Sequence, residues 1–148
     1  LQKIKVKPVA ESLLAVMKKV YADKKLTLQL VAEDNVFFLG DDNDLTEIFG
    51  NLLDNACKYG RNQVLVSIYK TTSGWQLCVE DDGPGVARSQ HEHILQRGVR
   101  LDSMTAGQGL GLALVSDILA LYNARLSIRE SPLGGACFAL EFDNQGAI

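Results

Sequence analysis

The chain has 148 residues, of which 47% are hydrophobic and 22% are charged, a composition typical of one globular domain over residues 1–148. Its net charge of −3 and its pI of about 5.3 argue against a nucleic-acid partner, which usually requires a basic face. No apolar run approaches the roughly 18 residues that a membrane-spanning helix needs, so membrane contact is expected only through segments outside this sequence.

The first half of the chain predicts two helices separated by two short strands. Residues 8–25 carry apolar side chains at helical spacing, with a proline in the first turn and lysines toward the end. Residues 26–32 and 36–40 form two short apolar runs, which are typical of strands. The polar run 41–43 then offers N-caps to a helix over residues 44–59.

The second half predicts two hairpins on either side of a third helix. Between the first hairpin and this helix lies a polar, glycine-bearing segment, and a loop of that length in a compact domain is usually functional. Together with the first half, this order predicts an α+β fold in which a largely antiparallel sheet packs on three helices. The strands are predicted over 63–71, 75–81, 124–131 and 135–142, and the helix over 111–123.

The three cysteines do not form a metal or disulfide pattern. Cys57, Cys78 and Cys137 are odd in number, widely spaced and without a C-x-x-C pair. Each lies in an apolar stretch, so we expect buried thiols and a reducing compartment.

Two asparagines interrupt the second predicted helix. Asn51 and Asn55 are four residues apart, and with Glu47 and Lys58 they form a polar stripe beside the apolar face. Amide oxygens are suitable ligands for Mg²⁺, and a lysine one turn away can neutralise a phosphate. The alternative interpretation is a solvated polar face that happens to contain two asparagines.

An acidic, glycine-containing turn follows the strand 75–81. In "VEDDGPGV", Gly83 and Gly85 allow a tight turn or the close approach of a ligand. Either Asp81 or Asp82 could accept a hydrogen bond from an exocyclic amine such as adenine N6. A solvated surface loop is the alternative.

A second glycine cluster, "GQGLGLALV", lies where the third helix begins. Gly107, Gly109 and Gly111 would let phosphates approach backbone amides at a helix N-terminus. The cluster matches neither the P-loop nor the dinucleotide-binding fingerprint. A flexible hinge before a packed helix is the alternative.

Taken together, "NLLDNACKY", "EDDGPG" and "GQGLGLAL" resemble the N, G1 and G2 boxes of the catalytic and ATP-binding domain of bacterial sensor histidine kinases. The resemblance runs from about residue 7 to 142, and the wording is most similar to PhoQ-type sensors. It implies the Bergerat (GHKL) fold, a two-layer α/β sandwich with a mixed, mostly antiparallel sheet, three helices and a long ATP lid. ATP and Mg²⁺ are the implied cofactors.

By position, the resemblance assigns roles to the helix that carries the asparagines. Asn55 is implied as the Mg²⁺ ligand, and Asn51 as the amide near the phosphates. Lys58 would contact phosphate and Tyr59 would pack beside the nucleotide. Glu47 matches an acid proposed to polarise the incoming histidine, so Glu47, Asn51 and Lys58 are the catalytic candidates.

The remaining implied contacts lie in the turn after residue 80 and in the lid. Asp81 aligns with the adenine-reading aspartate, and Gly83 and Gly85 would shape its pocket. Arg97 and Arg100 are the cationic lid candidates. The lid's return to the helix supplies Gly107, Gln108, Gly109, Leu110 and Gly111.

The sequence departs from the family pattern at two places in the lid. Leu95 stands where the family often has phenylalanine, and Thr105 and Ala106 stand where PhoQ-like sequences have arginine and proline. One phosphate contact is therefore missing from the expected set, which would weaken ATP binding or catalysis.

The resemblance implies a protein-histidine kinase catalytic domain of a two-component system. It would transfer the γ-phosphoryl of Mg·ATP to a histidine on a dimerisation domain outside this chain, for onward transfer to a response regulator. The full-length protein would be a homodimer in the inner membrane, with this domain in the cytoplasm. The alternatives are another ATPase of the same fold and a nucleotide-binding regulator without turnover.

Overall fold

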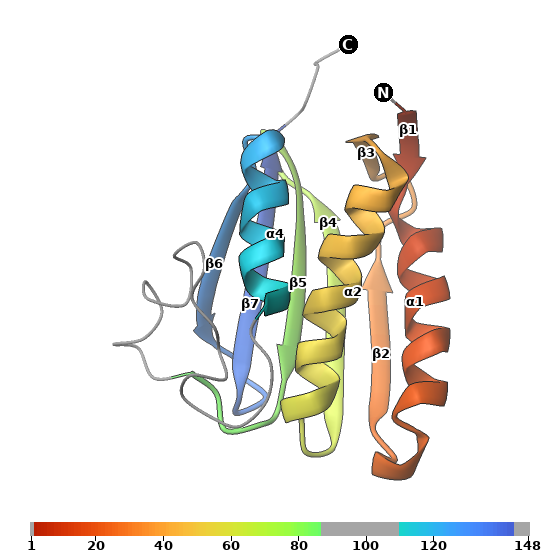
Figure 1. Cartoon of the computed structure of the whole chain (residues 1–148), viewed down its shortest axis with the longest axis vertical. Helices are drawn as coiled ribbons and strands as arrows, with labels where there is room; N and C mark the ends of the chain where they lie inside the picture. Colours follow the sequence, from red (N-terminus) through yellow and green to blue (C-terminus); the bar gives the residue numbers. More distant parts are fainter. Residues whose placement is uncertain (1, 87–109, 144–148) are drawn as a thin grey trace.

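The computed structural model describes residues 2–86 and 110–143 (Figure 1). Much of the candidate lid therefore lies outside the described residues. In chain order the elements are β1 (Gln2–Lys5), α1 (Val6–Val20), the 3₁₀ turn η1 (Ala22–Lys24), β2 (Thr27–Ala32), β3 (Phe37–Gly40), α2 (Asp42–Tyr59), β4 (Gln63–Lys70), β5 (Gly74–Asp81), α4 (Leu110–Leu121), β6 (Arg125–Glu130) and β7 (Ala136–Asp143).

Five strands form the main sheet in the order β2-β4-β5-β7-β6. The β4–β5 and β6–β7 hairpins are antiparallel, β5 pairs antiparallel with β7, and β2 pairs parallel with β4. Strands β1 and β3 make a separate antiparallel pair. Helices α1, α2 and α4 lie over one face of the main sheet, which gives two layers (Figure 1).

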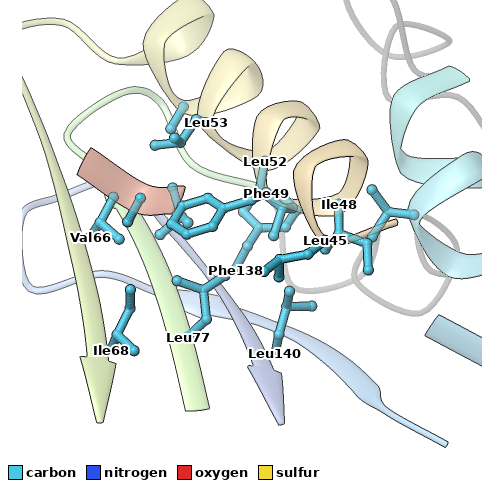
Figure 2. Close-up of a cluster of buried hydrophobic side chains, with 14 of the residues drawn as sticks. Leu45, Ile48, Phe49, Leu52, Leu53, Val66, Ile68, Leu77, Phe138 and Leu140 are labelled. Carbon is cyan, nitrogen blue, oxygen red and sulfur yellow. The ribbon is translucent and has the colours of Figure 1, made fainter. Parts of the chain in front are cut away.

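The core lies between the helices and this sheet face. Strand β4 alternates, with Val64, Val66 and Ile68 buried against the helices, as the period of two requires. Helix α2 supplies the apolar residues at helical spacing that meet them. Figure 2 shows this contact, in which Leu45, Ile48, Phe49, Leu52 and Leu53 approach Val66, Ile68, Leu77, Phe138 and Leu140.

The structure confirms most of the predicted elements and the predicted α+β sandwich. The first helix is the main exception, because α1 ends at Val20 and not at residue 25. The chain then forms η1 and turns at Lys25, whose φ of 54° is left-handed and incompatible with a continuing α-helix. Strand β1, before α1, is not predicted by the sequence pattern.

The cysteines are all buried, as predicted, but on two faces of the sheet. Cys57 belongs to the core between α2 and the sheet. Cys78 and Cys137 lie with Ala139 in a small cluster on the other face. Among residues 2–86 and 110–143, no helix is long and apolar enough to cross a membrane.

Candidate functional site

Helix α2 carries the polar stripe and is firmly anchored at its start. The Asp41 side chain accepts a 2.7 Å hydrogen bond from the Asn43 backbone N–H, which caps the helix. Asp42 and Asp44 in the first turn complement the positive end of the helix dipole. The cap and these two charges stabilise the start of α2, the helix that carries the polar stripe.

The polar stripe of α2 is most buried at Asn55. Glu47 is exposed, Asn51 and Lys58 are partly buried, and Asn55 is only 4% exposed. The Asn51 side-chain N–H donates to the Glu47 carbonyl at 2.7 Å, so its amide oxygen is the atom suited to a cation. A neutral amide at the Asn55 position avoids the large penalty of burying a charge.

Tyr59 ends the helix beside Lys58. The Lys58 ammonium lies 5.7 Å from the centre of the Tyr59 ring, within the range of a cation–π contact. The Tyr59 hydroxyl is buried and has no hydrogen-bond partner among the residues described. A buried hydroxyl without a partner is costly, and a bound ligand is one way to satisfy it.

Asp81 is a buried carboxylate at the end of β5. It is 4% exposed, and its Oδ1 accepts hydrogen bonds from the backbone N–H of Gly83 at 2.8 Å and of Ala136 at 3.4 Å. Burial raises the pKa of this carboxyl, although the two backbone hydrogen bonds oppose the shift. A carboxylate held in place but incompletely compensated is typical of a binding site.

Asp82 has different hydrogen-bond partners from Asp81. Its carboxylate accepts hydrogen bonds from the backbone N–H groups of Arg61, Asn62 and Gln63 at 2.8 to 3.2 Å. Burial opposes ionisation of Asp82, but these hydrogen bonds outweigh it and the pKa is lowered. Asp82 therefore organises the turn between α2 and β4.

Glycines let three backbone segments meet around Asp81. A Cβ atom at Gly83 would overlap the Tyr59 carbonyl oxygen, and one at Gly135 would overlap the Asp81 carboxylate. Gly85 has a φ of +75°, and a Cβ atom there would stand 3.5 Å from the Gly135 carbonyl carbon. The last turn of α2, the turn after β5 and the β6–β7 turn thus pack backbone against backbone.

Substitution of Gly83 by alanine should lower the free energy of unfolding by about 1–3 kcal/mol or more, because the new methyl group meets backbone that cannot move aside. Gly50→Ala is the matched control, since a Cβ atom at this α2 position would have no atom within 4 Å from any described residue beyond its own stretch of helix. The control should raise stability by about 0.5–1 kcal/mol. Urea denaturation of both variants tests the pair, and equal effects would contradict the packing described.

The structure tests only part of the predicted glycine cluster and lid. Helix α4 begins at Leu110, close to the predicted start, and it packs beside α2 (Figure 1). The backbone of Gly111 lies in its first turn. The residues predicted for the lid lie outside the described part of the chain; they are Leu95, Arg97, Arg100, Thr105, Ala106, Gly107, Gln108 and Gly109.

Sequence reasoning missed two backbone contacts of this site. Gly134 and Gly135 form a pair that resembles the last glycine box of the family, but no contact was predicted for them, and the Gly135 N–H donates to the Asp81 carbonyl at 3.1 Å. Gly60 follows α2, and a Cβ atom there would overlap the Ala56 carbonyl and stand 3.5 Å from Asp81 Cβ. A glycine directly after a predicted helix was the available signal for Gly60.

The fold and the site define an ATPase-type nucleotide-binding domain. Residues 40–146 match the family described as histidine kinase-, DNA gyrase B- and HSP90-like ATPase, and the chain belongs to this family. The matched region begins at the last residue of β3 and contains the asparagine stripe, Asp81 and the glycines around it.

Among characterised proteins, the chain is similar to the sensor protein PhoQ of Escherichia coli K12, with 39% identity over 95% of the chain. It spans 29% of the length of that relative. The fold matches the mycobacterial sensor histidine kinase MprB, with 22% identity, a TM-score of 0.84, and coverage of 97% of this chain and 99% of the other. It also matches full-length ShkA in complex with AMPPNP, with 24% identity, a TM-score of 0.79, and coverage of 97% and 31%.

Proposed function

We propose that this chain is the catalytic domain of a sensor histidine kinase, which binds Mg·ATP and transfers its γ-phosphoryl group to a histidine on a separate dimerisation domain. A response regulator then receives the phosphoryl group. The observation that carries the proposal is the buried Asp81 carboxylate, held by two backbone N–H groups at the meeting point of three glycine-containing segments. The family membership and the similarity to PhoQ support it.

The Asp81 carboxylate suits the adenine ring. Its Oδ1 accepts hydrogen bonds from the backbone N–H groups of Gly83 and Ala136, whereas no described residue donates one to Oδ2. In the proposal, Oδ2 accepts a hydrogen bond from the adenine N6 amine. In the proposal, Gly83 and Gly85 let the turn after β5 pack closely against Tyr59 and Gly135, which holds the Asp81 carboxylate in place beside the flat ring.

The stripe of α2 suits the phosphates and their metal ion. Asn55 supplies a neutral oxygen ligand for Mg²⁺, and Asn51 lies one turn away near the phosphates. Lys58 neutralises phosphate charge and Tyr59 packs against the nucleotide. When bound, Mg²⁺ supplies charge neutralisation at the phosphoryl oxygens, and Glu47 is placed at the exposed end of the stripe for the incoming histidine.

The lid residues complete the proposed site. Arg97 and Arg100 add positive charge near the phosphates, and Gly107, Gln108, Gly109, Leu110 and Gly111 bring the chain back to α4. ShkA, which shares the fold, has been crystallised with the ATP analogue AMPPNP. In the proposal, this domain lies on the cytoplasmic side, where ATP is available, of a membrane sensor whose other segments lie outside this chain.

A phosphotransfer assay tests the proposed reaction. The chain is mixed with the dimerisation domain of its own protein, γ-labelled ATP and Mg²⁺, and the product is then treated with acid and with alkali. The proposal predicts label on the dimerisation domain that is lost in acid and kept in alkali, as for phosphohistidine. Tight nucleotide binding without transfer would overturn it in favour of a regulator that only senses ATP.

A further inference from the structure

The Lys24 side chain makes an unusual contact with the end of α2. Its Nζ donates three hydrogen bonds, to the carbonyl oxygens of Cys57 at 2.7 Å, Lys58 at 2.8 Å and Gly60 at 2.8 Å. One ammonium group thereby uses all three of its protons on three backbone carbonyls from one turn. Lys24 lies in η1, more than thirty residues earlier in the sequence, and outside the matched region 40–146.

These carbonyls belong to the part of a helix that usually lacks partners. The last four carbonyl groups of an α-helix have no intrahelical donor, and they form the negative end of the helix dipole. In many helices, a glycine in the left-handed conformation after the last turn lets backbone N–H groups bind these carbonyls. Gly60 is instead extended, with φ −64° and ψ 145°. Lys24 therefore replaces the usual backbone cap with a charged side chain from another element.

The same turn forms one wall of the candidate site. The Tyr59 carbonyl packs against Gly83, and Gly60 lies against Asp81. Lys24 binds the carbonyl of Lys58 itself and those of Cys57 and Gly60 on either side of Lys58 and Tyr59, the two residues that the proposed function places at the phosphates and the nucleotide. The Lys24 charge also favours the ionised form of Asp81 and so lowers its pKa, against the larger effect of burial.

We propose that Lys24 is a positioning residue for nucleotide binding, which holds the last turn of α2 against the Asp81 turn from behind the site. The proposal rests on the proposed function, because it assumes that the nucleotide lies between this turn and Asp81. Lys24 does not touch the nucleotide. It fixes the backbone that presents Lys58, Tyr59 and the Asp81 pocket.

A neighbouring contact provides a control for stability alone. The Tyr21 hydroxyl donates a 2.6 Å hydrogen bond to Asp54, so it joins the same segment to α2 about one turn before the carbonyls that Lys24 binds. Tyr21→Phe removes this hydrogen bond and keeps the ring. It should lower the denaturation temperature without changing nucleotide affinity, because the last-turn carbonyls keep their donor.

Calorimetric titration of Mg·AMPPNP into the wild type, Lys24→Met, Lys24→Arg and Tyr21→Phe tests the proposal, at a temperature where circular dichroism shows every variant folded. We expect Lys24→Met to bind Mg·AMPPNP about tenfold more weakly than the wild type. An effect of this size is typical of the coupling between a binding site and a part of the protein outside it. Lys24→Arg should restore affinity to within about threefold of wild type, since a guanidinium also donates to several carbonyls. Lys24→Gln provides the same comparison if Lys24→Met does not fold.

The outcomes separate this proposal from the proposed function. If the wild type itself does not bind Mg·AMPPNP, the proposed function fails. If the wild type binds and folded Lys24→Met binds equally well, the role of Lys24 is refuted while the function stands. An equal loss of affinity in Tyr21→Phe would also refute it, because stability alone would then explain the effect.

Discussion

Replacement of Asp81 by asparagine should give a protein that is at least as stable as the wild type but binds ATP about ten to a hundred times more weakly. A hydrogen bond to a charged group contributes about 1.5–3 kcal/mol, which corresponds to that range of affinity. The amide can also donate to the O6 atom of guanine, which the carboxylate repels. The preference for ATP over GTP should therefore shrink together with the affinity.

The stability of Asp81→Asn follows from the raised pKa of the carboxyl. Burial makes the ionised form less favourable in the folded chain than in the unfolded one, so ionisation of Asp81 lowers stability at neutral pH. Asparagine removes this charge, and its oxygen can still accept from Gly83 and Ala136. The stability advantage of the variant should disappear as the pH falls from the raised pKa toward 3.8, the ordinary value.

Asp82→Asn is the matched control, because the Asp82 carboxyl is adjacent in sequence and its pKa is shifted in the opposite direction from that of Asp81. The lowered pKa of Asp82 means that its ionised form stabilises the fold above pH 3.8, through the turn at Arg61, Asn62 and Gln63. Asp82→Asn should thus lose stability and keep its preference for ATP. Titration with ATP and GTP, together with urea denaturation, distinguishes the two variants, and an unchanged preference in Asp81→Asn would refute the adenine contact.

Replacement of Asn55 by aspartate should reduce Mg·ATP-dependent phosphotransfer about a hundredfold. The change keeps the size of the side chain but adds a negative charge at a position that is 4% exposed. A carboxylate there repels the phosphates and loses the amide donor, and its burial opposes folding. The initial rate of autophosphorylation at saturating Mg²⁺ is the measurement.

Asn43→Asp is the control for this charge change. Asn43 is exposed in the first turn of the same helix, where a negative charge is favourable to the helix dipole. This variant should keep nearly wild-type activity and stability. Near-normal phosphotransfer in Asn55→Asp, with the protein folded, would contradict the requirement for a neutral amide at this position.

The sequence predicts the elements of this fold well because their periodicity is strong. The hairpins β4–β5 and β6–β7 and helix α2 follow from alternation and helical spacing. The end of α1 was wrong by several residues, since the apolar pattern continues into η1 while the backbone turns at Lys25. Strand β1 is too short to give a signal, and its pairing with β3 is a tertiary contact.

The candidate site was harder to predict in its details than in its location. The residues alone left Asp81 and Asp82 as alternatives and the resemblance favoured Asp81, but the contacts that each makes come from the fold, in which Asp81 is buried and Asp82 binds the turn beside it. Lys24 has no local signal, because its partners are more than thirty residues away and are backbone atoms. Contacts of this kind depend on how the elements pack and cannot be inferred from local pattern.

A crystal structure of this chain with Mg²⁺ and AMPPNP tests the central claim most directly, since it locates the base, the phosphates and the metal ion together. The account predicts the adenine N6 amine within hydrogen-bond distance of the Asp81 carboxylate, with Mg²⁺ coordinated by the Asn55 amide oxygen. A nucleotide bound elsewhere, or bound here with its base away from Asp81 and its metal ion away from Asn55, would contradict the account.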